Sequence, residues 1–327
     1  MPVWLNIWLK GGKGVLDYQK LRDGTGHVLA WLFSSLSIVA CLSIIFYLFI
    51  RGFAQINPDF ILTPPNPTLN QDMSGGISTP IAGTFLLTLT GILLAAPWAL
   101  ATAIYLAEYG GSQAMVQIFR LAIDVLAGVP TIVIAIFGLA IFSLPQLGFL
   151  SSMVEGVDGV ERSFGRSFLV TGITMAIMIL PFVIKICEEA LKAVPNYYRE
   201  AALSMGASKW QSIVTVVLPS ARQGILTGII LGMGRIIGDT AIVWLTLGGT
   251  IRMTGIQPWW YPVHWWSTLC NTGSTLTSYI YFASPAGEGN MPDKAFGAAL
   301  VLIILIIVLN IFTDLLERFG ANKIKGN

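Results

Sequence analysis

The chain has 327 residues, of which 54% are hydrophobic and only 11% are charged, and its mean hydropathy is +0.73. Soluble domains carry about 25% charged residues, so this composition excludes an ordinary soluble protein and indicates an integral membrane protein. A formal net charge of +2 offers no basic face for nucleic acid. The two histidines and three cysteines lack the spacing of a metal or redox motif, and we therefore predict no metal site.

Apolar runs long enough to cross a bilayer occur six times along the chain. A spanning helix needs about 20 mostly apolar residues, because each adds about 1.5 Å across a hydrocarbon core of about 30 Å. The runs are 28–50, 81–107, 121–144, 167–186, 221–247 and 296–316. They predict an all-α integral membrane protein with about six transmembrane helices. Pro97, Pro130 and Pro181 fall inside three of the runs, where we expect a break or a kink.

The loops between these runs predict the orientation of the chain. If residues 1–27 are cytoplasmic, the loops on that side carry most of the 19 Lys and Arg residues. This bias predicts that both termini are cytoplasmic. We divide the chain into an N-terminal segment that can form an interfacial helix, a first span with its external loop, a transmembrane domain and a cytoplasmic tail. These four parts are 1–27, 28–80, 81–318 and 319–327.

The loop between the fourth and fifth runs, residues 194–219, reads VPNYYREAALSMGASKWQSIVTVVLP. Its pattern predicts a short helix that stops at Gly206, then a second helix that Ser208 and Gln211 begin as a capping box and Pro219 ends. The first helix has about ten residues, or roughly 15 Å, which is too short to cross a membrane. We expect it at the cytoplasmic surface, either as a docking site for another protein or as a connector that contacts nothing.

The spacing in this loop resembles the EAA signature of the permeases of binding-protein-dependent ABC importers. The matching positions are Glu200-Ala201-Ala202, Gly206 and Leu218-Pro219, while Val216 stands where the signature has isoleucine. In that family the first helix is a coupling helix that docks into a groove of a separate ATPase subunit. The resemblance implies a type I ABC importer permease fold. It also implies a coupling set made of Arg199, Glu200, Ala201, Ala202, Met205, Gly206, Leu218 and Pro219.

Four further stretches resemble the phosphate-import permeases. They are APWALATAIYLAEYG at 96–110, LAGVPTIVIAIFGL at 126–139, IMILP at 177–181 and GRIIGDTA at 234–241. The last matches a family motif R-A-x-G-E-T, with Ile236 in place of alanine and Asp239 in place of glutamate. The C-terminal part is more similar to the PstA-type subunit than to its PstC-type homologue. The resemblance implies a bacterial cytoplasmic (inner) membrane protein that imports phosphate.

The same resemblance implies the partners. They are a PstC-type permease, a dimer of PstB-type ATP-binding cassette subunits and a PstS-type extracytoplasmic phosphate-binding protein, besides membrane lipid. The chain has no G-x-x-x-x-G-K-[ST] motif, and KGGKG at 10–14 lacks its spacing. We therefore expect a transport subunit with no catalytic residue and no cofactor of its own. ATP and Mg would be bound by the partner ATPase.

Two charges, Arg235 and Asp239, interrupt the fifth apolar run. A charge at bilayer depth costs at least a few kcal/mol, so it usually pairs with another charge or marks a transport pathway. Arg235 follows Arg222 by about 20 Å of helix, near mid-bilayer, and Asp239 would lie one turn further on the same face. A guanidinium binds two oxygens of an anion, and a carboxylate can accept the proton that phosphate carries and sulfate lacks.

We predict that Arg235, Asp239 and Thr240 line the substrate pathway, and the alternative is an Arg235–Asp239 ion pair that only holds helices together. For the whole chain, the alternatives are a permease for another oxyanion or a polar solute. A different class, an ion channel or a membrane scaffold without an ATPase, also stays open.

Overall fold

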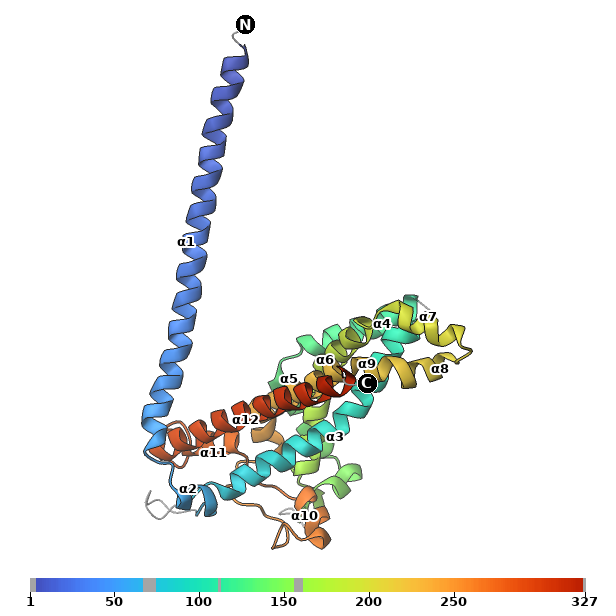
Figure 1. The fold of residues 1–327 in the computed structure, drawn as a ribbon. Coiled ribbons are helices and arrows are strands. Elements are labelled where there is room, and N and C mark those ends of the chain that lie inside the picture. Colours follow the sequence, from blue (N-terminus) through green and yellow to red (C-terminus); the bar gives the residue numbers. More distant parts are fainter. Residues whose placement is uncertain (1–3, 67–74, 111–112, 156–160, 326–327) are drawn as a thin grey trace.

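The computed structural model describes residues 4–66, 75–110, 113–155 and 161–325. Its helices are α1 (Trp4–Phe53), α2 (Pro58–Leu62), α3 (Ser78–Glu108), α4 (Gln113–Gly128), α5 (Thr131–Phe142), α6 (Phe168–Lys192), α7 (Asn196–Ser204), α8 (Lys209–Ser212), α9 (Leu218–Gly238), α10 (Trp265–Cys270), α11 (Leu276–Ala283) and α12 (Pro292–Lys325). A small antiparallel hairpin, β1 (Met153–Glu155) with β2 (Glu161–Ser163), pairs Met153 with Ser163. Figure 1 places α7 and α8 at one end of the helical bundle and α2 and α10 at the other.

Five helical stretches are long and apolar enough to cross a membrane. They are Thr25–Phe53, Ser78–Glu108, Phe168–Lys192, Lys209–Gly238 and Pro292–Phe312, and α4 with α5 passes the same test as a bent pair. The prediction of an all-α membrane fold with about six spans is therefore confirmed. The third predicted run is not one straight helix, because α4 and α5 meet at 98°. Pro130 is the N-cap of α5 and disfavours the helical conformation at Val129, and Gly128 further weakens the end of α4.

The expected breaks at the other two prolines are absent, since α3 continues through Pro97 and α6 through Pro181. These two helices form the centre of the bundle together with α9. Helix α6 is the most enclosed, with 61% of its apolar window buried. Ser167 begins it by accepting a hydrogen bond from the Val170 N–H at 3.1 Å. Helix α3 presents Ala95, Ala99 and Ala103, all fully buried, and such small side chains let membrane helices approach closely.

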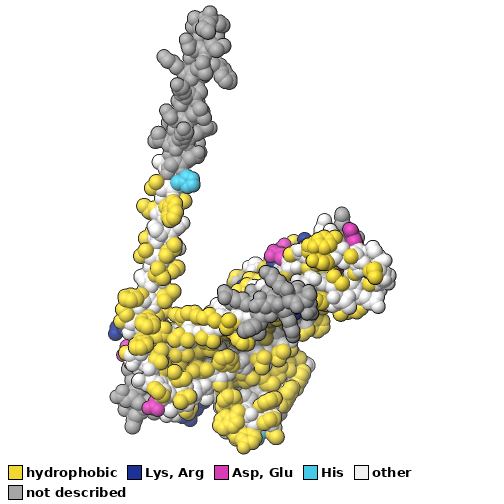
Figure 2. Space-filling model, viewed as in Figure 1, with side chains coloured by type: hydrophobic (Ala, Val, Ile, Leu, Met, Phe, Trp, Pro, Cys, Tyr) yellow, Lys and Arg dark blue, Asp and Glu magenta, His cyan; other side chains and the backbone are white. Residues whose placement is uncertain are grey.

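Helix α1 lies apart from this centre. Its last turns pack against α12, where the Tyr47 and Phe296 rings meet edge to face at 5.6 Å, and Figure 1 shows the rest extending away from the bundle. Most apolar side chains between 28 and 50 are exposed, and Figure 2 shows them covering the helix. The backbone of α1 is helical without interruption from Trp4, so the N-terminal segment and the first span form one helix. Residues 1–3 lie outside the described part of the chain.

Candidate substrate pathway and coupling surface

The fifth span ends at the charged motif and does not pass through it. Helix α9 stops at Gly238, and Asp239 has extended dihedrals (φ −78°, ψ 136°). Asp239 Oδ1 accepts a hydrogen bond from the Ile242 N–H at 2.8 Å and so caps a short helical segment that continues into the π turn Val243–Leu247. The prediction of one helix over 221–247 is therefore wrong. A short carboxylate side chain competes for backbone N–H groups and favours helix starts over helix interiors.

Arg235 lies on the open side of α9. Its side chain is exposed, whereas Ile236 and Ile237 beside it are buried in the core. The guanidinium carbon lies 5.7 Å from the Phe182 ring centroid, a cation–π arrangement with α6. A Cβ added at Gly234 or Gly238 would meet no atom within 4 Å, so both flanking glycines leave this surface bare. The last turns of α9 thus carry a guanidinium on an open face.

Gly232, earlier in α9, allows close packing between helices. At Gly232 an added Cβ would lie 2.8 Å from Val183 Cγ2, which shows close packing of α9 against α6 one turn before Arg235.

Arg235 and Asp239 are close enough to interact electrostatically but do not make an ion-pair contact. Within the described residues they form no ion pair, and Arg235 makes no hydrogen bond there. Thr240 follows the break and is exposed, while Asp239 is half-buried. The structure therefore places the three predicted pathway residues at one helix break, where the arginine makes no ion-pair contact within the described residues. The pathway role of the three residues and the alternative of a structural Arg235–Asp239 pair both stay predictions.

The predicted coupling segment has the expected local structure. Helix α7 (Asn196–Ser204) ends in a Schellman motif, in which Gly206 at φ +83° donates to the Leu203 carbonyl at 3.0 Å and Ala207 donates to Ala202 at 3.2 Å. Ser208 and Gln211 then form a capping box at the start of α8, through hydrogen bonds of 2.8 and 3.3 Å. Both sequence predictions are confirmed.

The surface of α7 is open to a partner. None of its residues is buried. Glu200 and Ala201 are exposed, Ala202 is half-buried, and the Met205 side chain that follows is 88% exposed. A hydrogen bond with Tyr198 raises the pKa of Tyr197 above its ordinary value. An apolar methionine beside small alanines and one carboxylate is suited to enter a groove of another protein.

Pro219 does not end the second helix, contrary to the sequence prediction. The chain continues from α8 through the π turn Ile213–Val217 directly into α9, where Pro219 lies in the first turn. The Leu218 N–H donates to the Ile213 carbonyl five residues back. A wider turn at this point accommodates a residue that has no N–H and whose ring would clash in a regular helix. Leu218 and Pro219 thus belong to the entry of the fifth span and not to the surface of α7.

Arg199 is also placed differently from the prediction, which put it on the docking surface. Its guanidinium turns inward and contacts Glu108 Oε1 at the end of α3, at 2.8 and 3.0 Å. It also donates to the backbone carbonyls of Leu191 at 2.8 Å and Val194 at 2.5 Å. The side chains of Arg199 and Glu108 are only 18% and 7% exposed. The partner carboxylate lies 91 positions away in the chain, so no local pattern could have revealed this contact.

Further ion pairs join α4 to α6 at the same end of the bundle. Glu188 of α6 accepts from Arg120 of α4 at 2.5 Å, and Lys185 of α6 pairs with Asp124 of α4 at 2.6 Å. Within α6, Glu188 also accepts from Lys192 at 2.6 Å. The i,i+4 spacing of Arg120 and Asp124 suggests a pair within α4, but each side chain instead reaches across to α6. These contacts fix α4 beside α6.

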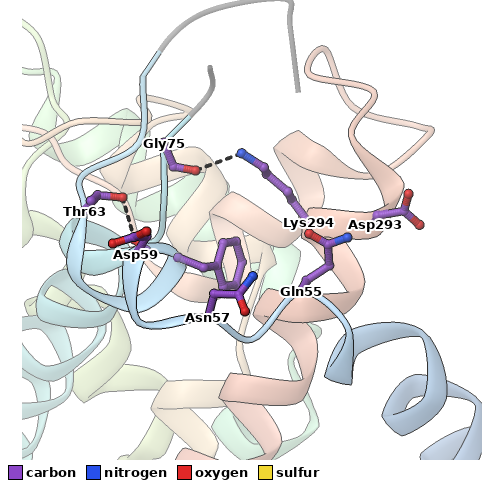
Figure 3. A pocket seen from close by; sticks show the side chains of 8 residues that line it. Gln55, Asn57, Asp59, Thr63, Gly75, Asp293 and Lys294 are labelled. Atoms are coloured by element: carbon purple, nitrogen blue, oxygen red, sulfur yellow. Dashed lines mark hydrogen bonds between the residues drawn. The ribbon is translucent and has the colours of Figure 1, made fainter. Parts of the chain in front are cut away.

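The opposite end of the bundle holds a polar pocket of about 410 Å³ that the sequence did not predict. Figure 3 shows residues of the 55–63 segment, together with Gly75, beside the first turn of α12. Lys294 Nζ donates to the Gly75 carbonyl at 2.9 Å, and the Asp59 and Asp293 carboxylates also line the pocket. Segments so far apart in sequence carry no shared signal, which is why the pocket could be found only in the structure.

Comparison with known proteins identifies a family that the chain matches. A family model described as "Binding-protein-dependent transport system inner membrane component" matches residues 99–326. The chain is 31% identical over 255 residues to the phosphate transport system permease protein PstA 1 of Mycobacterium tuberculosis (strain CDC 1551 / Oshkosh), covering 78% of this chain and 74% of that protein. It is 26% identical over 312 residues to the probable ABC transporter permease protein YqgI of Bacillus subtilis (strain 168), covering 94% and 99%.

A solved structure shares the fold. A bacterial alginate ABC transporter, determined in complex with an alginate pentasaccharide-bound periplasmic protein, aligns with a TM-score of 0.59 at 16% identity, over 88% of this chain and 94% of the matched one. The helical arrangement described above is therefore that of ABC importer permeases, as the EAA signature implied.

Proposed function

The chain belongs to the family of binding-protein-dependent transport system inner membrane components, the permeases of ABC importers, and we propose that its substrate is inorganic phosphate. The observation that carries the proposal is Arg235, a guanidinium on the open face of α9 that makes no ion-pair contact within the described residues. An intramembrane arginine without such a partner is costly, and an anion that passes it supplies the missing charge. The PstA relative, named for phosphate transport, supports this choice of anion.

Asp239 is suited to select phosphate among oxyanions. Its Oδ1 is engaged by the Ile242 N–H, which fixes the carboxylate and leaves Oδ2 to accept a further hydrogen bond. Phosphate near neutral pH carries a proton that it can donate to this oxygen, whereas sulfate has none and would meet only repulsion. Arg235 would bind the anion through two of its N–H groups, and Asp239 would favour an anion that carries a proton.

The energy for transport would come from partner subunits, because this permease family has no ATP site of its own. We propose that Glu200, Ala201, Ala202 and Met205 dock into a groove on a PstB-type ATPase, which binds ATP and Mg. A PstC-type permease would complete the pathway opposite Arg235, and a PstS-type binding protein would deliver phosphate to the α10 end. With both termini cytoplasmic, α7 lies on the ATPase side of the membrane. Closure of the ATPases would move α7 and thereby change the side of the membrane to which the Arg235 region is open.

The test is to purify the chain with these partners, reconstitute it in proteoliposomes and measure ATP-dependent uptake of radiolabelled phosphate, with sulfate as competitor. We expect phosphate uptake that sulfate does not inhibit. Uptake of another oxyanion or of a polar solute in its place would assign a different substrate. If no ATPase assembles with the chain, or if solute crosses without ATP, the protein is a channel or a scaffold and the proposal fails.

A further inference from the structure

Arg199 is the point at which the helix α7 is tied to the membrane bundle. Its guanidinium contacts Glu108 at the end of α3 and the carbonyls of Leu191 in α6 and Val194 just after it. A further hydrogen bond of 3.3 Å reaches Asn196 Oδ1 in the first turn of α7 itself. All three guanidinium nitrogens are used, so one side chain joins the ends of two spans to the short helix.

The rest of α7 offers little to hold it. No α7 residue is buried, and the helix otherwise lies against α8 and the π turn at the start of the fifth span. Beside it, Lys209 of α8 lies 4.8 Å from the ring centroid of Tyr109, which directly follows Glu108. Two cationic side chains therefore contact the C-terminal end of α3, Arg199 at its last residue and Lys209 at the residue that follows it. A force applied to the exposed face of α7 reaches α3 and α6 mainly through these polar contacts.

The chemistry of the contact requires arginine. The planar fork of the guanidinium reaches a carboxylate and two carbonyls in fixed directions, whereas a lysine ammonium is a point charge that cannot satisfy all of them from one position. Because Glu108 is almost completely buried, the pair is screened little by water or salt. Such a contact transmits displacement, unlike an exposed ion pair that opens and closes freely.

We propose that Arg199 is a positioning residue that locks α7 to the ends of α3 and α6, so that movement of α7 by an ATPase partner is passed to the spans and does not merely bend the loop. This inference rests on the proposed function, in which α7 is the ATPase docking helix. It assigns to Arg199 and Glu108 a role within the permease, separate from the docking contacts of Glu200 and Met205.

The experiment uses the complete importer in proteoliposomes and measures phosphate uptake and ATP hydrolysis on the same sample. For Arg199→Ala and for Glu108→Gln we expect the ATPases still to assemble and hydrolyse ATP, while the phosphate imported per ATP falls about tenfold or more. Arg199→Lys should lie between the alanine variant and the wild type. The matched control is Asp124→Asn, which removes another ion-pair carboxylate at this end of the bundle, on a pair whose partners are both about half-exposed and do not contact α7.

A second measurement covers the case in which Arg199→Ala fails to assemble. In a background without the three native cysteines, Glu108→Cys is combined with Arg199→Cys, and a short bismaleimide then links the two thiols. We expect the unlinked protein to be uncoupled and the linked protein to regain transport per ATP. Unchanged coupling in Arg199→Ala and Glu108→Gln, or no recovery on linking, overturns the inference. If the wild-type complex itself imports no phosphate, the proposed function is what fails.

Discussion

The Asp239 carboxylate and the Ile242 N–H are joined by a hydrogen bond of 2.8 Å that gives one residue two separable properties, a helix cap and a negative charge. Asparagine caps helices about as well as aspartate but carries no charge, whereas alanine does neither. We expect Asp239→Asn to keep the local structure and to lose the preference for phosphate over sulfate. Asp239→Ala should lose this preference too and, in addition, destabilise the segment after the break by about 1 kcal/mol.

Uptake of radiolabelled phosphate in the presence of increasing sulfate measures this preference for each variant. If Asp239→Asn discriminates between the two anions as well as the wild type does, the carboxylate has only a capping role and the selectivity lies elsewhere in the pathway.

Arg235 provides the second prediction, because it makes no ion-pair contact in the described part of the chain. Arg235→Ala should reduce phosphate uptake to background while the ATPase subunits still co-purify, since the side chain is exposed and far from α7. Arg235→Lys should keep part of the uptake, because an ammonium supplies the charge without the two-point geometry. Arg222→Gln is the control: it removes a positive charge about 20 Å earlier on the same helix and should leave uptake nearly unchanged. Full uptake by Arg235→Ala would remove this residue from the pathway.

Gly206 allows the coupling segment to be tested through its backbone alone. The residue has φ +83°, and an added Cβ would meet no atom within 4 Å, so a side chain there affects only the dihedral angles. Asparagine tolerates this conformation, whereas a β-branched residue strains it by at least about 1–2 kcal/mol. We expect Gly206→Asn to couple ATP hydrolysis to uptake nearly normally and Gly206→Val to lose ATPase binding or coupling. Equal coupling in the two variants would show that the turn after α7 does not set the docking geometry.

The sequence predicted those features that depend on local patterns. Apolar run length identified the spans, and the Gly206 stop and the Ser208–Gln211 capping box were correct because each depends on a few neighbouring residues. Hydropathy alone could not show that the fifth run breaks at Asp239, since the residues after the break are as apolar as those before it.

Contacts between residues far apart in the chain could not be predicted from such local patterns. Arg199 looked like a docking residue because it precedes the EAA positions, yet its partner Glu108 comes from a helix that ends far earlier in the chain. The three prolines also show the limit of a local rule. Of the three, Pro130, which has a glycine two residues before it, breaks its run, while Pro97, which is exposed, and Pro181, which is buried, lie within continuous helices.

The attachment of α11 to α3 through Thr84 and Leu276 gives a prediction about stability. Leu276 begins α11, so its N–H has no partner within that helix, and it donates instead to Thr84 Oγ1 at 2.9 Å. Both residues are buried. Thr84→Val keeps the side-chain shape but leaves this N–H without an acceptor, which should cost about 1–3 kcal/mol.

Thr102→Val is the matched control on the same helix, because the Thr102 hydroxyl is exposed and donates only to the Trp98 carbonyl one turn back, so the change should fall within about 0.5 kcal/mol. Thermal unfolding of the two variants in the same detergent, at the same heating rate, compares them directly, and Thr84→Ser should recover most of the loss. Identical unfolding temperatures for Thr84→Val and Thr102→Val would mean that water or a shifted backbone replaces the Thr84 hydroxyl, and that α11 is held to α3 by apolar packing alone.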